Sequence, residues 1–102
     1  MLEKSIEEYL ILRVKSLGGE CIKVETSSSR GWPDRLCIIP GGKVFFVETK
    51  KPVGGVLSKF QYYTIAKIRA LGACAYVAHT REGIDAIIHE VQSSGDVASN
   101  GV

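Results

Sequence analysis

Residues 31–50, GWPDRLCIIPGGKVFFVETK, decide the fold because they contain two strongly apolar runs joined by a glycine turn. The runs LCII and KVFFV have the composition of buried β-strands, and the PGG segment at 40–42 is typical of a hairpin. We therefore expect antiparallel strands over residues 34–39 and 43–50. Both strands are apolar at odd and at even positions, which predicts a sheet covered by helices on both faces.

The segments on either side of the hairpin alternate between helical and extended patterns. Apolar residues recur at helical spacing over 2–17 and again over 57–71, and each pattern ends at a glycine. The other expected elements are strands over 21–25 and 73–79 and a helix over 81–91. The order predicts an α/β fold with a central sheet between helices.

Length and composition indicate one domain. A chain of 102 residues with 45% hydrophobic residues can bury a single core. We place this domain at residues 1–92 and expect the tail, residues 93–102, to be disordered because it has neither pattern nor bulk. Lys and Arg number 13 against 11 Asp and Glu, so net charge gives only a slight preference for acidic partners such as nucleic acid.

The cysteines and the amino terminus indicate the cellular compartment. Cys21, Cys37 and Cys74 are odd in number, lie in apolar stretches and lack the close pairs of a zinc site, so we expect buried thiols in a reducing cytoplasm. The amino terminus is too charged for a signal peptide, and no apolar run approaches the ~20 residues that span a bilayer. The sequence therefore predicts a soluble cytoplasmic protein with no membrane segment.

Charged residues stand where the second apolar strand should continue. Because side chains alternate along a strand, Glu48 and Lys50 extend the face of Val44 and Phe46. A charge in such a place costs several kcal/mol unless it is paired or bound to a metal. Asp34 opens the preceding strand, so the hairpin brings a second acid to the same end.

The register of the hairpin decides whether the two acids meet. A two-residue turn pairs Pro40 with Lys43, and Asp34 then faces Thr49 rather than Glu48. The acids share a face only if the hairpin contains a one-residue bulge, which is common in glycine-rich hairpins. The structural alternative is an ion pair between Asp34 and Lys50 at the sheet edge, with Glu48 in water.

Polar groups also lie on the inward faces of two helices. At about 100° per residue, Glu3 falls about 20° from the centre of the first apolar stripe, and Glu7 lies at the edge of the stripe. Glu3 could instead interact only with the helix dipole. Gln61 faces inward on the helix over 57–71, although Ser58 and Gln61 also match a capping box, in which Gln61 folds back onto the Ser58 amide.

Basic and aromatic side chains surround these segments. The basic residues are Arg30, Arg35, Lys51 and Lys59. They could contact a phosphate backbone or remain solvated surface charges. The aromatic residues Trp32, Tyr62 and Tyr63 could stack on bases or pack within the protein.

The set of Pro33-Asp34, Glu48-Thr49-Lys50, an inward acid on the first helix and Gln61 resembles the PD-(D/E)xK nuclease superfamily. Within it, the order GWPD, hairpin, VETKKP, LSKFQ and LGACAYVA is similar to the virus-type replication-repair nuclease (VRR-NUC) domain, from about Glu3 to Val91. This resemblance implies a restriction-endonuclease-like α-β-β-β-α-β core with a central mixed sheet flanked by helices.

The resemblance also implies roles for the site residues. Asp34 and Glu48 become metal-binding carboxylates, joined by the Thr49 carbonyl, while Lys50 becomes the catalytic lysine and Gln61 the helix glutamine. The acid of the first helix is Glu3, ranked ahead of Glu7. Oxygen ligands of this kind hold Mg²⁺ or Mn²⁺.

The implied activity is that of a homodimeric, metal-dependent DNA endonuclease that prefers branched DNA such as four-way junctions. Two alternatives remain. One is a DNA-binding module on the same fold that lacks turnover, and the other is an interaction domain that binds neither metal nor DNA.

Overall fold

The computed structural model describes residues 2–25 and 30–100, with side chains described as far as residue 94. The elements are α1 (Glu3–Ser16), β1 (Glu20–Lys23), β2 (Arg35–Ile39), β3 (Lys43–Thr49), α2 (Lys59–Ala70), β4 (Cys74–Ala78) and α3 (Arg81–Asn100). The strands form one sheet in the order β1-β2-β3-β4, in which β3 and β4 are parallel and the other neighbours antiparallel. The predicted α/β fold with a central mixed sheet is confirmed.

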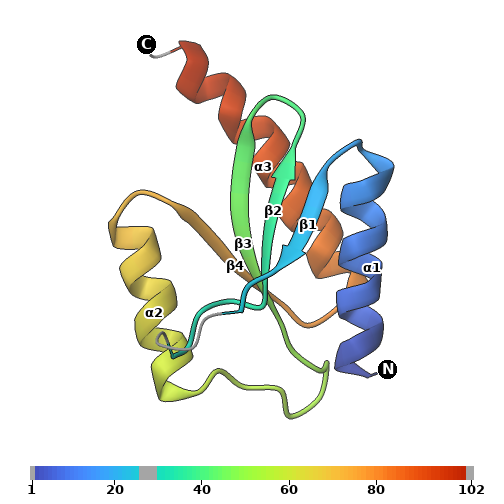
Figure 1. The fold of residues 1–102 in the computed structure, drawn as a ribbon, viewed down its shortest axis with the longest axis vertical. Helices are drawn as coiled ribbons and strands as arrows, with labels where there is room; N and C mark the ends of the chain where they lie inside the picture. The colour runs from blue at the N-terminus through green and yellow to red at the C-terminus, as the bar shows by residue number, and fades with distance from the viewer. Residues whose placement is uncertain (1, 26–29, 101–102) are drawn as a thin grey trace.

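The sheet lies between two helical layers, with α1 and α3 on one side and α2 on the other (Figure 1). On the strands β2 and β3, the odd-numbered residues Cys37, Phe45 and Val47 are fully buried in the core with α1 and α3. The even-numbered Phe46 belongs to a smaller cluster that includes Ile65 of α2. Alternation along the strands therefore assigns Glu48, another even-numbered residue, to the face of α2.

Helices α1 and α2 end as the glycines predict. After α1, the Gly18 N–H donates to the Lys15 carbonyl and the Gly19 N–H to the Val14 carbonyl, at 2.9 and 3.0 Å. Gly18 has a φ of 85°, the left-handed conformation that this Schellman arrangement requires. Gly72 ends α2 in the same way, with a φ of 90°. These ends set where the chain turns into β1 and β4.

The hairpin turn differs from the predicted two-residue turn. Ile39 pairs with Lys43, so three residues, 40–42, form the connection. Gly41 and Gly42 have φ values of 97° and 72°, a conformation that residues with a side chain rarely adopt. The pairing of Pro40 with Lys43 that a two-residue turn predicts is therefore wrong. The turn contains one extra residue at the glycines, which shifts the register by one, as the predicted one-residue bulge near the glycines would.

Helix α2 covers only part of its side of the sheet. Ile38 and Val44, even-numbered residues near the turn, are 42% and 48% exposed. Ile22, on the edge strand β1, is also exposed. The prediction of strands covered on both faces is therefore wrong at this end of the hairpin, because α2 packs mainly on β4 and the adjoining part of β3.

The carboxyl-terminal helix is longer than predicted. Its backbone is helical from Arg81 to Asn100, whereas the sequence pattern predicts an end at Val91 and a disordered tail from residue 93. The first serines of this segment bond within the helix, since the Ser93 hydroxyl donates to the His89 carbonyl at 2.9 Å. Residues 101 and 102 of the predicted tail lie outside the described range.

The three cysteines are free, but they are not equally buried. Cys37 is buried and Cys21 partly so, whereas Cys74 is exposed. The prediction of three buried thiols is wrong for Cys74, because this residue starts the edge strand β4. Among the residues that the structure describes, no helix is both long and apolar enough to cross a membrane.

Candidate active site

The three-residue turn brings the two acids together. The last paired residues of β2 and β3 are Arg35 and Val47, and one further step along the same register places Asp34 opposite Glu48. The Asp34 backbone N–H donates to Glu48 Oε1 at 3.1 Å. The common face that the site requires is thus produced by the length of the turn.

Glu48 is a buried carboxylate surrounded by hydrogen-bond donors. Only 2% of the residue is exposed. Besides the Asp34 amide, its Oε2 accepts from Gln61 Nε2 at 2.9 Å and lies 3.3 Å from Lys50 Nζ. Because Glu48 pairs with Lys50 and is out of water, the alternative of an Asp34–Lys50 pair with a solvated Glu48 is wrong.

Burial and charge both act on the pKa of Glu48. Burial, and after it the neighbouring negative charge of Asp34, raise this pKa, and the net result is a value of about 7. Lys50 opposes both effects by its charge and by its hydrogen bond. Glu48 therefore holds a proton near neutral pH more readily than an ordinary glutamate, and a cation beside it would favour the charged form.

Gln61 satisfies both roles that its position in the sequence allows. The side-chain Oε1 of Gln61 accepts from the Ser58 backbone N–H at 2.9 Å, and the backbone N–H of Gln61 donates to Ser58 Oγ at 3.1 Å. These two bonds complete the capping box at the start of α2. Its Nε2 points the other way, to Glu48. A single amide therefore caps the helix and fixes the orientation of the buried carboxylate.

The two acids of α1 occupy different surroundings. Glu7 Oε2 accepts from Arg35 Nε at 2.8 Å, and both side chains are largely buried. Glu3, predicted to lie within the apolar stripe, is exposed, because the buried positions of α1 begin only at Ile6. The structure thus links Glu7, through Arg35, to the strand that Asp34 precedes.

The four basic candidates are not equally available. Arg35 is engaged by Glu7, which leaves it less suited to contact DNA. The Arg30 guanidinium lies over the Phe60 ring, 4.9 Å from the ring centroid. Lys51 and Lys59 are exposed.

The donors at this end of the sheet suit a hard divalent cation. Asp34 and Glu48 supply carboxylate oxygens, and the contacts of Asp34 Oδ2 with the Thr49 N–H and hydroxyl are long, at 3.4 and 3.3 Å. Over residues 2–25 and 30–94, no three His, Cys, Asp or Glu side chains converge. Two carboxylates and the Thr49 carbonyl could hold the ion, and Mg²⁺ commonly binds with so few protein ligands because water and phosphate complete its shell.

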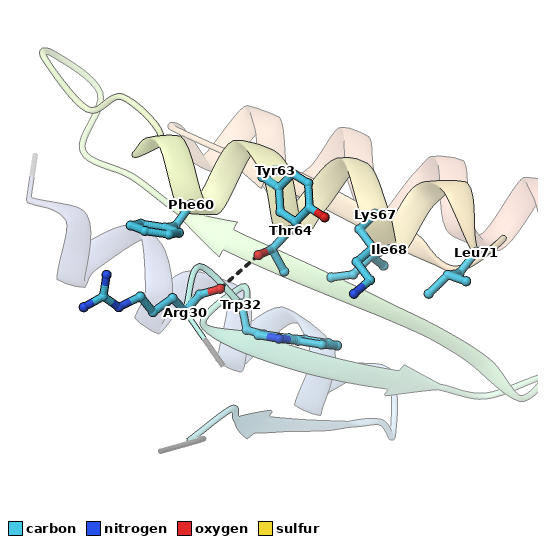
Figure 2. A pocket seen from close by; sticks show the side chains of 8 residues that line it. All are labelled: Arg30, Trp32, Phe60, Tyr63, Thr64, Lys67, Ile68 and Leu71. Atoms are coloured by element: carbon cyan, nitrogen blue, oxygen red, sulfur yellow. Dashed lines mark hydrogen bonds between the residues drawn. The ribbon is translucent and has the colours of Figure 1, made fainter. Parts of the chain in front are cut away.

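Sequence reasoning missed a groove on the same face as Glu48. It lies between α2 and the loop before β2, has a volume of about 350 Å³, and is hereafter the α2 groove. Its main side chains are Arg30, Trp32, Phe60, Tyr63, Thr64 and Lys67 (Figure 2). The spacing of residues 60, 63, 64 and 67 along one helix face is the signal that could have indicated it.

Comparisons with known proteins agree with this geometry, although a scan against known protein families gives no match. The chain is 41% identical over 70 residues to "Putative nuclease p44" of Acyrthosiphon pisum secondary endosymbiont phage 1, which covers 69% of this chain and 74% of that protein. A solved structure described as a VRR_NUC domain matches with a TM-score of 0.80 and 30% identity, covering 85% of this chain and 94% of the other.

The mixed sheet between helices, with two acids and a lysine at one end, is the arrangement of the PD-(D/E)xK class. At the identity and coverage just given, the chain belongs to the VRR-NUC family.

Proposed function

We propose that this protein is a divalent-metal-dependent DNA endonuclease that hydrolyses phosphodiester bonds. The observation that carries the proposal is the buried Glu48, hydrogen-bonded to the backbone of Asp34 and paired with Lys50 at the end of the sheet. A purely structural ion pair would not need a second acid beside it. The name of the phage relative and the fold of the VRR_NUC neighbour support the same activity.

Each side chain has a distinct task in this proposal. Asp34, Glu48 and the Thr49 carbonyl would hold Mg²⁺ or Mn²⁺, which supplies Lewis-acid stabilisation of the charge that builds on the phosphate. Lys50 orients the attacking water or stabilises the developing charge, because its ammonium lies beside Glu48. Gln61 keeps the Glu48 carboxylate in one orientation.

Exposed cations around the acids would position the substrate. Lys51 and Lys59 flank the loop between β3 and α2, and the Arg30 guanidinium lies over the ring of Phe60 in α2. Such cations contact phosphates without reading sequence. The proposed preference is therefore for a DNA structure, with branched DNA such as a four-way junction as the candidate substrate.

A homodimer suits a small domain that must cut two strands. The exposed Ile22, Ile38 and Val44 form an apolar area on the uncovered end of the sheet, and such areas commonly mark contacts with other proteins. We assign this area to the second copy of the chain. Sedimentation of the wild type and of an Ile38→Lys variant tests the assignment, with a monomeric variant expected.

The activity is tested with supercoiled plasmid, flap and four-way-junction DNA, each with Mn²⁺, with Mg²⁺ and with EDTA. We expect metal-dependent cleavage by the wild type and none by Asp34→Asn, which removes a charge with little change in volume. Glu8→Gln, an exposed acid on α1, is the matched control and should cleave normally. Metal-independent DNA binding without cleavage would instead support the inactive binding module.

A further inference from the structure

Specific contacts hold the two walls of the α2 groove in place. Gly31, with a φ of 76°, lies so close to α2 that a Cβ on it would stand 2.3 Å from the Phe60 carbonyl oxygen. The Thr64 hydroxyl donates to the Arg30 carbonyl at 2.9 Å (Figure 2). The Trp32 ring meets Phe46 edge to face, with centroids 5.6 Å apart. The loop is therefore fastened to both the helix and the sheet.

The chemistry of the α2 groove favours a flat ligand that carries negative charge. Trp32, Phe60 and Tyr63 are all exposed, so ring surface is available without rearrangement. Arg30 and Lys67 supply positive charge, and none of the lining residues is acidic. Indeed α2, KFQYYTIAKIRA, contains lysine and arginine but no acid. Aromatic rings interspersed with cations are the combination that binds single-stranded nucleic acid.

The position of the α2 groove connects it to the acids. Trp32 precedes Asp34 by two residues on the fastened loop, and Phe60 precedes Gln61, whose amide holds Glu48. A strand whose phosphate lies at the acids would therefore pass beside the rings. The volume of about 350 Å³ also lies at the lower end of the range of small-ligand sites, about 300–1,000 Å³.

We propose that the α2 groove receives an unpaired base of the DNA strand next to the scissile phosphate. Within a duplex both faces of a base are covered by its neighbours, so only an unstacked base can offer a face to Trp32 or Tyr63. The groove would then select branched or partly single-stranded DNA over continuous duplex. This inference rests on the proposed nuclease function and specifies its substrate.

The single tryptophan of the chain makes the inference measurable, because Trp32 fluorescence reports on the α2 groove alone. The full-length protein is titrated in EDTA, which prevents cleavage, with a short oligothymidylate and with a blunt duplex of equal length. We expect the single strand to quench Trp32 and the duplex to bind without quenching. Equal quenching by both, or none by either, overturns the inference.

Two neighbouring tyrosines provide a matched pair of variants. Tyr63 lines the α2 groove, whereas Tyr62 lines a different surface, and they are 67% and 71% exposed on the same helix. Tyr63→Ala should weaken binding of the single strand about 5-fold or more, the loss expected for one stacked base, while Tyr62→Ala changes it little. Equal effects of the two substitutions contradict the inference. Circular dichroism checks that both variants fold.

The remaining outcomes separate the inference from the proposed function. Cleavage of DNA without Trp32 quenching leaves the nuclease standing and refutes the base site alone. Quenching without cleavage of any substrate supports the base site and refutes the nuclease. If Trp32 emission changes with protein concentration and Tyr63→Ala turns a dimer into a monomer, a second copy occupies the α2 groove and the inference is wrong.

Discussion

Glu48 should make the metal-free protein less stable as the pH rises from 4.5 to about 7. Its pKa is raised from 4.5 to about 7, so between these values the folded protein keeps a proton that the unfolded chain has lost. Stability from this group is present below pH 4.5 and is lost as the pH approaches 7. At about 1.4 kcal/mol for each pH unit, the loss amounts to about 3 kcal/mol.

Glu48→Gln isolates this contribution, because glutamine has a similar volume and does not titrate. Urea denaturation of both proteins between pH 4.5 and 8, in EDTA, gives the free energy of unfolding at each pH. We expect the wild type to lose about 3 kcal/mol relative to the variant across this range, since ionisable groups remote from Glu48 contribute equally to both proteins. Parallel curves for the two proteins would refute the reasoning.

Metal should reverse the loss at high pH. A cation at ~100 times its dissociation constant stabilises the folded state by about 2.7 kcal/mol if it binds only that state. At pH 8 we expect Mn²⁺ to stabilise the wild type by an amount of this order and Glu48→Gln much less. Stabilisation of both proteins alike would show that the ion binds elsewhere.

Three further substitutions, two of them paired with a comparison variant, test individual side chains. Lys50→Ala should lose most cleavage activity yet bind Mn²⁺ at least as tightly by calorimetry, because a nearby positive charge is removed; loss of folding would show a structural role. Gln61→Ala should cost about 1 kcal/mol of stability and lower kcat ~10-fold or more, whereas Ser58→Ala should cost only the stability of the cap. Glu7→Gln should lower the free energy of unfolding by about 0.5–1 kcal/mol and reduce cleavage, whereas Glu3→Gln should behave like the wild type. If Glu3→Gln loses cleavage and Glu7→Gln keeps it, the helix acid that takes part in cleavage is Glu3.

The order of elements could be predicted because local sequence features mark the ends of α1 and α2 and the two strands of the hairpin. Glycines with positive φ end α1 and α2, and the apolar runs around residues 36–39 and 43–47 are too short and too rich in β-formers for helices. Strand alternation alone predicted that Glu48 and Lys50 lie on the same face, but it did not predict that their side chains pair.

The extent of coverage could not be predicted in the same way. Ile38 and Val44 are as apolar as buried strand residues, and only the placement of α2 over β4 leaves them exposed. Tyr62 and Tyr63 pose the same difficulty, because adjacent helical positions point about 100° apart and the sequence does not say which one meets the loop. Tertiary placement decided both cases.

Gln61 shows a different limit of sequence reasoning. A capping role and a site role looked like competing explanations, yet an amide has a carbonyl end and an amino end. The Oε1 atom accepts from the Ser58 N–H and the Nε2 atom donates to Glu48, so the capping bond and the contact with Glu48 exist together. Polar side chains with two ends can meet a local and a distant requirement together.

The number of residues in the hairpin turn also determines whether the two acids of the site lie on the same face of the sheet. Gly41 lies midway between Asp34 and Glu48, and acids related by such a midpoint face each other only if the turn contains an odd number of residues. A substitution that favours an even turn without changing the chain length would slide one strand by a residue and send one acid to the opposite face. Gly41→Asn creates the Asn-Gly pair that favours two-residue turns, so a change at the far end of the hairpin could dismantle the site while leaving all its residues in place.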